Sequence, residues 1–413
     1  MGLTVGVDPI FIFLCFTVAG AFFSNAVLQT ASGLVVLLWL VRLLSGHRHA
    51  FGRSDSPWTG VSWPPRNWPL WKPSLAFLLV SILSAAASAD SGRSFSKLHE
   101  AFLPLLLFAA LPSLASESRT SALIRLMSLC AFVAAGMGLY EFTGTVGDQR
   151  IQGSLGNWMT YSQVLLLAAP MIAARLLWCR SKASPIELIV LLVILAAILC
   201  SKTRGVWLGG IAGAALLLLV WRPKWVLALP FVILAAYALA PQSVQDRAHS
   251  LFDKDNATIQ ERLYMWRAGC LMVEDRPLLG IGPGQVKALY PQYRLEDDPR
   301  TSKKVLGHLH SNPVQIAAEL GLIGVSVWIW FWIAVAMGLW HRWREQASGV
   351  GRASIVGVSA SLLALQVAGL TEYNFGDSEV TTLAFCILAM SFVSETKDSS
   401  RVAVQSELGH VAG

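Results

Sequence analysis

The chain has 413 residues, of which 54% are hydrophobic and only 14% are charged. Soluble domains carry about 25% charged residues, so this composition excludes an ordinary soluble fold. The net charge of +7 would suit a nucleic-acid partner, but Lys and Arg lie mainly in short segments between long apolar runs. That pattern is typical of membrane orientation, so we expect membrane lipids around the chain and no nucleic acid.

Apolar runs of the length needed to cross a hydrocarbon core recur along the whole chain. The runs cover residues 9–24, 26–44, 73–89, 95–112, 121–141, 158–178, 185–201, 204–221, 224–240, 313–340, 353–372 and 379–394. They predict an all-α polytopic membrane protein with about 12 transmembrane helices. The first run is expected to be a retained span, because the residues before it contain no Lys or Arg and no positive signal-peptide region.

The charges of the connecting loops predict the orientation of the chain. Lys and Arg of the short loops divide 17 to 5 between the two sides. The side richer in positive charge is expected to face the cytoplasm, which puts both termini there.

Four regions follow from these spans. Residues 1–240 hold spans one to nine, with a cytoplasmic connector rich in Trp and Pro at 54–73. Residues 241–312 form one large outer loop that contains short helices. Residues 313–394 hold spans ten to twelve, and residues 395–413 form a polar cytoplasmic tail.

Within the outer loop, residues from Gln260 onward have helical spacing. Leu263, Trp266 and Cys270 fall on one face and Arg262 lies near the polar side, which predicts an amphipathic helix at the membrane surface. The turn at 280–284 is rich in Gly but lacks the Lys and the strand context of a nucleotide-binding loop. Six scattered cysteines have no metal-ligand spacing, and a Cys200–Cys270 bridge is the only disulfide considered.

The loop ends in the sequence His308-Leu-His310-Ser-Asn-Pro. Asn312 as N-cap and Pro313 at the first helical position predict a helix start, so His310 lies just before the N-terminus of span ten. The positive end of a helix disfavours imidazolium, which suits a neutral His310 that accepts a proton. The alternatives are a purely structural histidine and a metal site, but no third ligand follows at metal-site spacing.

The surrounding pattern resembles one family. His310-Ser311, nine further residues and then Gly321-x-x-Gly324 resemble the outer-loop signature of the bacterial O-antigen ligases, which share a membrane glycosyltransferase superfamily with the O-antigen polymerases. The Arg262-x-x-x-Trp266 element, the Pro-Leu-Leu-Gly-x-Gly run after it and Arg204 extend the resemblance over residues 200–325. The first half is similar only in having many apolar helices.

The resemblance implies transfer of an O-antigen polysaccharide from undecaprenyl diphosphate to a sugar of lipid A–core. The reaction would take place at the periplasmic face of the bacterial inner membrane, which makes the outer loop periplasmic. Breaking a sugar–diphosphate bond requires stabilisation of a leaving group that gains negative charge, and arginine forks supply it without a metal. We therefore expect an inverting displacement with no metal and no cofactor.

The same resemblance implies the site residues. His310 is expected to be the base that deprotonates the acceptor hydroxyl. Arg204 and Arg262 are expected to bind the diphosphate, and Arg267 is the alternative candidate. His308 is a secondary contact, expected to be dispensable unless it donates to phosphate.

Five carboxylates outside that set are assigned other roles. Glu372 and Asp377, in the last outer turn, are expected to orient His310 or to contact acceptor hydroxyls. Glu319, within span ten, holds an arginine or caps the span, since an unpaired carboxylate is costly in a membrane. The adjacent pair Asp297-Asp298 is expected to be solvated, because a metal motif would be spaced.

Other interpretations remain open. Arg204 at a span end can snorkel to lipid phosphates, and Arg262 can be a surface charge of its helix. An O-antigen polymerase or a protein O-oligosaccharyltransferase of the same superfamily would use the same donor. A transporter would have two similar halves with broken helices, which the sequence lacks.

Overall fold

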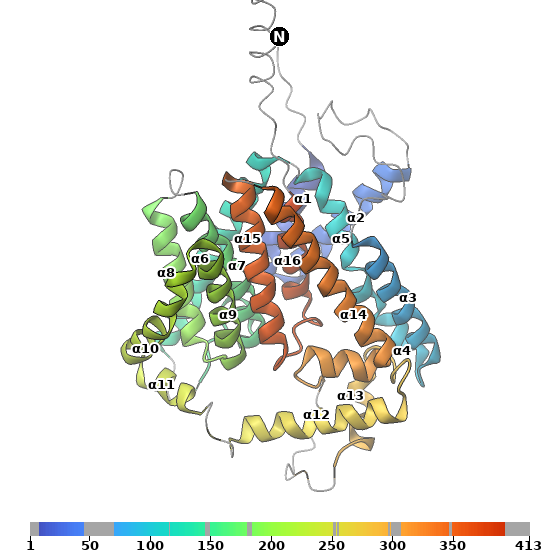
Figure 1. The fold of residues 1–413 in the computed structure, drawn as a ribbon. Coiled ribbons are helices and arrows are strands. Elements are labelled where there is room, and N and C mark those ends of the chain that lie inside the picture. The colour runs from blue at the N-terminus through green and yellow to red at the C-terminus, as the bar shows by residue number, and fades with distance from the viewer. Residues whose placement is uncertain are drawn as a thin grey trace, which may run out of the picture.

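The computed structural model describes residues 8–44, 70–114, 116–144, 149–179, 184–250, 253, 256–295, 298, 307–346 and 349–392. The described residues form helices and short 3-10 turns, with no strand among them (Figure 1). Most of the predicted connector at 54–73, the tail at 395–413 and Asp297 lie outside these residues.

The first part of the chain forms a bundle of apolar helices. Its elements are α1 (Pro9–Phe23), α2 (Asn25–Leu44), α3 (Trp71–Ala87), α4 (Ser91–Ser96), η1 (Leu98–Phe102), α5 (Pro104–Ala110), η2 (Leu111–Ser113), α6 (Glu117–Thr143), η3 (Gly153–Leu155), α7 (Trp158–Trp178), α8 (Pro185–Cys200) and α9 (Arg204–Trp221).

The second part adds the outer loop and the last spans. Its elements are η5 (Pro223–Ala228), α10 (Leu229–Leu239), α11 (Gln242–His249), α12 (Ala257–Asp275), α13 (Val286–Leu289), η6 (Tyr290–Gln292), α14 (Asn312–Glu345), α15 (Gly349–Gly369), α16 (Ser378–Ala389) and η7 (Met390–Phe392). Helices α11, α12 and α13 lie at one end of the bundle, where α12 runs across it (Figure 1).

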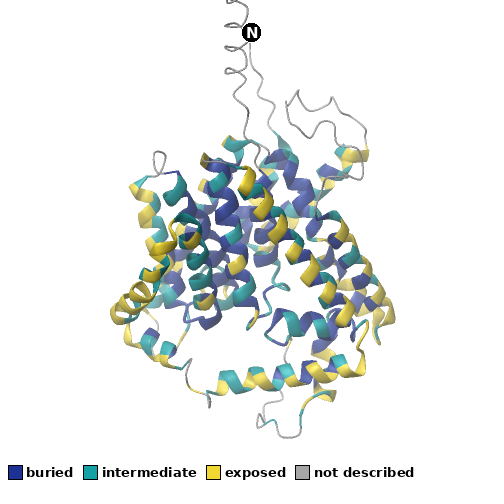
Figure 2. Ribbon diagram, viewed as in Figure 1, coloured by how far each residue is buried: buried dark blue, intermediate teal, exposed yellow. Residues whose placement is uncertain are grey.

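The distribution of burial is that of a membrane protein. Helices α7, α15 and α16 are buried along most of their length, whereas α8 and α10 expose large apolar side chains such as Ile186 and Phe231 (Figure 2). Apolar exposure on this scale is stable only in lipid. The structure therefore confirms an all-α polytopic membrane protein.

Seven helical segments in the described residues are long and apolar enough to cross a membrane, and five shorter apolar helices accompany them. These twelve segments overlap the twelve predicted spans, but length and composition alone do not decide which of the shorter ones cross. The number of twelve therefore stays a prediction.

The span predicted over 95–112 corresponds to the candidate span Ser91–Ser113, which is not one continuous helix. The chain there is divided into α4, η1, α5 and η2. Pro104 begins α5 and Pro112 is the second residue of η2, because proline lacks the N–H that would continue the preceding helix. The break leaves η1, with Glu100, at the same end of the bundle as the outer loop.

The span predicted over 313–340 corresponds to α14, which is broken at Gly321. This residue has φ 69° and ψ −171°, a region open to glycine only. The loop at 277–282 fills the break: Ile281 N donates to Ala318 O at 2.9 Å, and Leu322 N donates to Pro277 O at 2.8 Å. A Cβ on Gly321 would lie 2.3 Å from the carbonyl oxygen of Leu278. Residues 312–320 are thereby a separate short helix.

Helix α12 forms where the spacing predicts it, but with a different buried face. Its buried residues are Met265, Ala268, Gly269 and Met272, which pack with Leu309 and Ala318 in one cluster. Leu263 and Cys270, predicted to share the apolar face, are exposed. The sequence offers two apolar stripes at helical spacing, and contact with α14 selects the one that includes Gly269, against which Val314 packs closely.

Candidate functional site

Two segments from different parts of the chain lie side by side at the end of the bundle. One is the turn before α14, residues 307–311, and the other is the turn between α15 and α16, residues 370–377. They are joined in register, because His310 bonds to Glu372 and Asn312 bonds to Asn374. The predicted base and a predicted secondary residue thus meet across 62 positions of sequence.

Asn312 holds this pairing and does not act as the predicted N-cap. Its Nδ2 donates to Asn374 Oδ1 at 2.6 Å, and its Oδ1 accepts from Phe375 N at 3.1 Å. Ser311 occupies the capping position, with no hydrogen bond from its side chain to the helix. Asn312 and Asn374 are each 1% exposed. Its hydrogen bonds to Asn374 and Phe375 therefore both join the two turns.

Glu372 links His310 to Arg262. Its Oε2 lies 2.9 Å from His310 Nδ1, and its Oε1 accepts from Arg262 Nη2. The carboxylate is 3% exposed, so both interactions are largely screened from water. A carboxylate at Nδ1 favours the tautomer with hydrogen on that nitrogen, which leaves Nε2 to accept a proton. It also stabilises the imidazolium that forms when Nε2 is protonated.

The backbone of His310 has φ +50°, in the left-handed region that residues with a side chain rarely adopt. Such a conformation costs on the order of 1–3 kcal/mol and persists where surrounding contacts enforce it. Here the enforcing contacts are the bond to Glu372 and the Asn312–Asn374 pair next to it.

The N-terminus of α9 lies against the same carboxylate. A Cβ on Gly205 would lie 2.6 Å from Thr371 Oγ1 and 3.8 Å from Glu372 Cγ. A helix N-terminus carries partial positive charge, which favours an ionised carboxylate beside it. Only a glycine allows this approach, so Gly205 contributes to the site although sequence reasoning passed over it.

The predicted arginines separate in the structure. Arg262 contacts Glu372, whereas Arg204 Nη1 donates to Ser250 O at 2.8 Å and Nη2 donates to Asn256 Oδ1 at 3.4 Å. Arg204 thereby ties the start of α9 to the chain between α11 and α12. Arg267 is on the exposed face of α12, with its guanidinium 5.8 Å from the ring centre of Tyr264.

His308 packs on His310, with 4.2 Å between the ring centres. Burial, followed by the neighbouring His310, lowers the pKa of His308 to about 4, so its ring is neutral at physiological pH. Its Nδ1 is enclosed and has no hydrogen-bond partner. His308 therefore presents an uncharged polar atom within the site.

Asp377 is near Glu372 but does not contact His310. Its Oδ2 accepts from Thr160 Oγ1 at 3.0 Å, which joins the 370–377 turn to α7. Burial, together with the carboxylates of Glu379 and Glu372, raises the pKa of Asp377 to about 6.

Glu319 holds backbone and amide groups and contacts no arginine among the described residues. Its Oε1 accepts from Gly284 N at 2.9 Å and from Gln315 Nε2 at 2.8 Å. It therefore fastens the glycine-rich loop to the first half of α14. Of its two predicted roles, arginine holding is wrong.

Sequence reasoning missed three residues at this end. Tyr373 follows Glu372 and packs near His308, with 5.9 Å between ring centres. Tyr373 also hydrogen-bonds to Glu100, which is paired with Lys97 at 3.5 Å. The available signal was a carboxylate inside an apolar run, which is costly unless it has a partner.

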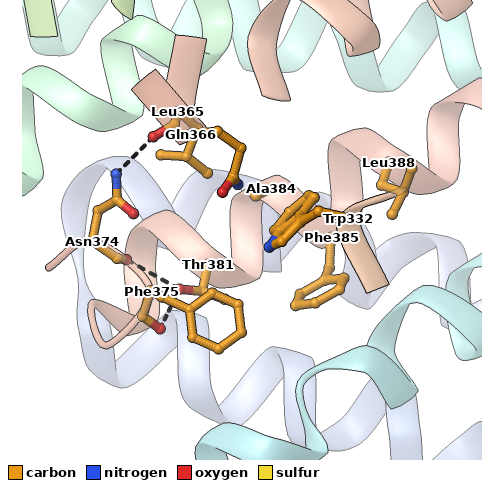
Figure 3. Close-up of a pocket in the computed structure, with 9 residues that line it drawn as sticks. All are labelled: Trp332, Leu365, Gln366, Asn374, Phe375, Thr381, Ala384, Phe385 and Leu388. Atoms are coloured by element: carbon orange, nitrogen blue, oxygen red, sulfur yellow. Dashed lines mark hydrogen bonds between the residues drawn. The ribbon is translucent and has the colours of Figure 1, made fainter. Parts of the chain in front are cut away.

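A small pocket lies behind the 370–377 turn, among α14, α15 and α16 (Figure 3). Its lining is mostly apolar and consists of Trp332, Leu365, Gln366, Asn374, Phe375, Thr381, Ala384, Phe385 and Leu388. Thr381 Oγ1 donates to the carbonyl oxygens of Asn374 and Phe375, at 3.3 and 2.9 Å. Helix α16 thus supports the turn that carries Glu372.

The considered Cys200–Cys270 bridge is wrong, because Cys200 is buried at the end of α8 and Cys270 is exposed on α12, both as free thiols. Among the described residues, no three His, Cys, Asp or Glu side chains are grouped to hold a metal ion.

The comparison with protein families agrees with the region that the sequence motif singled out. Residues 189–329 match the family model described as O-Antigen ligase. The matched segment is about a third of the chain and includes Arg204, Arg262 and His310. No curated protein matches the chain. The matched segment supports membership of the O-antigen ligase superfamily, a group of glycosyltransferase-like membrane enzymes.

Proposed function

We propose that the protein is an O-antigen ligase that transfers a polysaccharide from undecaprenyl diphosphate to a sugar of lipid A–core. The observation that carries the proposal is the contact of Arg262 and His310, both in the segment that matches the ligase family, with the buried carboxylate of Glu372. It joins a proton acceptor to a permanent positive charge, which are the two groups that glycosyl transfer from a diphosphate requires.

In this reaction the acceptor hydroxyl oxygen attacks the anomeric carbon of the donor sugar. His310 Nε2 takes the hydroxyl proton, and Glu372 stabilises the imidazolium through Nδ1. The bond from the anomeric carbon to the phosphate oxygen breaks, and its electron pair stays on the diphosphate. One displacement inverts the anomeric centre.

Arg262 is the arginine suited to the leaving diphosphate. A guanidinium has five N–H donors, so Arg262 can bond to Glu372 and to a phosphate oxygen at the same time. Arg204 is a less direct candidate, because its hydrogen bonds to Ser250 and Asn256 hold the outer loop. Arg267, exposed and stacked near Tyr264, is the least suited.

We further propose that the chain lies in the bacterial inner membrane with both termini in the cytoplasm and residues 241–312 in the periplasm. The 17-to-5 division of Lys and Arg among the short loops supports this orientation. Undecaprenyl diphosphate glycans and lipid A–core would then reach the site from the outer leaflet.

The test is transfer by the purified protein from a lipid-linked polysaccharide to lipid A–core, with a parallel reaction that contains the donor alone. A ligase makes polysaccharide-bearing lipid A–core, whereas a polymerase elongates the donor. We expect His310→Ala to lower the rate by about 10²–10⁴. His341→Ala, a histidine that is 77% exposed at the other end of α14, is the matched control and should keep the wild-type rate.

The same assay tests the metal-independent mechanism. EDTA should leave the transfer rate unchanged, because arginine supplies the charge in the proposed mechanism. Loss of activity in EDTA with specific recovery in Mg²⁺ or Mn²⁺ would refute that mechanism. A protein that modifies neither lipid A–core nor its own donor would refute the proposed function as a whole.

A further inference from the structure

The two sides of the His310 ring differ in chemistry. On one side, Arg262 and the N-terminus of α9 surround Glu372 and bring positive charge. His308 packs on the ring, Tyr373 lies beside His308, and Glu100 follows with its partner Lys97, so the charges of this last pair offset each other. The site thus has a positively charged part around Glu372 and a polar part whose charges are balanced.

Glu100 reaches this site from the first half of the chain, because α4 and η1 are anchored to the glycine-rich loop. Gln285 Nε2 donates to Asp90 O at 2.7 Å and to Ser94 Oγ at 2.9 Å. A Cβ on Gly282 would lie 2.3 Å from Ser88 Cβ, so only a glycine permits the approach. Figure 1 shows α4 at the same end of the bundle as α12 and α13.

Contacts at its ring and at its hydroxyl hold the Tyr373 side chain in place. A Cβ on Gly376 would lie 2.2 Å from the Tyr373 ring, so the ring folds back over its own turn. Its hydroxyl bonds to Glu100, and its ring is 5.9 Å from that of His308. Buried polar contacts on both ends of the side chain leave the ring little freedom.

The three side chains offer what a sugar ring requires. A tyrosine ring packs on the C–H face of a sugar and presents a polar tip. A carboxylate accepts from hydroxyl groups, and a neutral imidazole either donates or accepts. His308 is neutral at working pH, so its ring can donate to or accept from a hydroxyl without first gaining or losing a proton.

We propose that His308, Tyr373 and Glu100 form the subsite that binds the acceptor sugar and holds its hydroxyl toward His310. This inference rests on the proposed function, since it names where the second substrate of that reaction binds. Arg262 favours the diphosphate beside Glu372, whereas the Glu100–Lys97 pair brings no net charge to attract it. The division thereby sets donor and acceptor on opposite sides of the base.

Two acceptors present the group that this subsite would bind, a sugar with neighbouring hydroxyls. One is lipid A–core, and the other is the terminal sugar of a second lipid-linked glycan. The subsite is proposed for the acceptor in both cases, and assays with each acceptor distinguish them.

The experiment measures initial transfer rates while the concentrations of acceptor and donor are varied separately. Tyr373→Phe removes one hydroxyl and keeps the ring, and Glu100→Gln keeps the shape and removes the charge. Both should raise KM for the acceptor by about tenfold, the effect of losing one hydrogen bond to a charged group. KM for the donor should stay within about twofold. Glu274→Gln, an exposed carboxylate on α12, is the matched control and should change neither value.

A second measurement does not depend on the variants folding. A delipidated, dephosphorylated core oligosaccharide should inhibit the wild-type protein in competition with the acceptor and not with the donor. Equal changes in both KM values, a fall in kcat alone, or an oligosaccharide that does not compete with the acceptor would overturn the subsite. Wild-type protein that transfers to neither acceptor would instead overturn the proposed function.

Discussion

Replacement of Glu372 by Gln tests how His310 is activated. Gln has the same shape as Glu, so the 370–377 turn should keep its Asn312–Asn374 pairing. The change removes the negative charge that contacts both His310 and Arg262. Protonation of His310 during the reaction would then create a buried positive charge beside Arg262 with no carboxylate between them.

The structure sets the size of the effect. At an effective dielectric constant of about 20, a carboxylate and an imidazolium separated by 2.9 Å attract by about 6 kcal/mol. Desolvation of the carboxylate, which is 3% exposed, offsets part of this attraction. Half of it, about 3 kcal/mol, corresponds to a rate about 10²-fold lower. We expect this loss in kcat, because the imidazolium exists only after the proton is transferred.

The assay is single-turnover transfer with donor and acceptor at saturation, using variants matched for yield and monodispersity. Glu379→Gln, a carboxylate in the first turn of α16, is the control and should stay within about threefold of wild type. A Glu372→Gln rate that close to wild type, while His310→Ala is inactive, would refute the role of the carboxylate.

Four further predictions concern the arginine, the helix break, a buried acid and the topology. Arg262→Lys should recover only part of the transfer lost in Arg262→Ala, because lysine cannot bond in two directions as a planar fork; full recovery would mean that charge alone suffices. Gly321→Ala should lower the thermal midpoint or prevent folding in fluorescence-detected size exclusion, since its Cβ would meet backbone at 2.3 Å, while Gly136→Ala on α6, with nothing within 4 Å, should be tolerated. The pKa of Asp377 is raised from 3.8 to about 6, so its folded state binds the proton more tightly and stability falls as pH rises through that window; Asp377→Asn should therefore gain thermal stability relative to wild type between pH 4 and 7, and a gain that shrinks with pH would contradict the sign. A membrane-impermeant maleimide should label exposed native Cys270 from the periplasm and fail in Cys270→Ser, whereas labelling only from the cytoplasm would reverse the topology.

Local patterns in the sequence were sufficient for the class of fold and for part of the site. The long apolar runs can be stable only in lipid, so the membrane class follows from composition alone. Short motifs likewise singled out His310 and Arg262 as candidates, because the spacing of a motif can be recognised without knowledge of the fold. The superfamily match covers the same region.

Tertiary structure alone decided how α14 is broken and which face of α12 is buried. The run around Gly321 is apolar apart from Glu319, and its break depends on hydrogen bonds from residues 277–282, earlier in the chain. In α12, two stripes of apolar residues satisfy the helical period, and only contact with α14 distinguishes between them. Periodicity reports that a face exists, but its partner determines which face is used.

Which residues contact His310 could be known only from the fold. Glu372 was a candidate among several outer carboxylates, and its bond to His310 depends on a register between two turns that Asn312 and Asn374 set. Glu100 comes from a predicted membrane span that the structure divides into short helices, and Tyr373 lies in a turn near the other end of the chain. A sequence states which side chains are present; which of them meet depends on long-range contacts that no local pattern encodes.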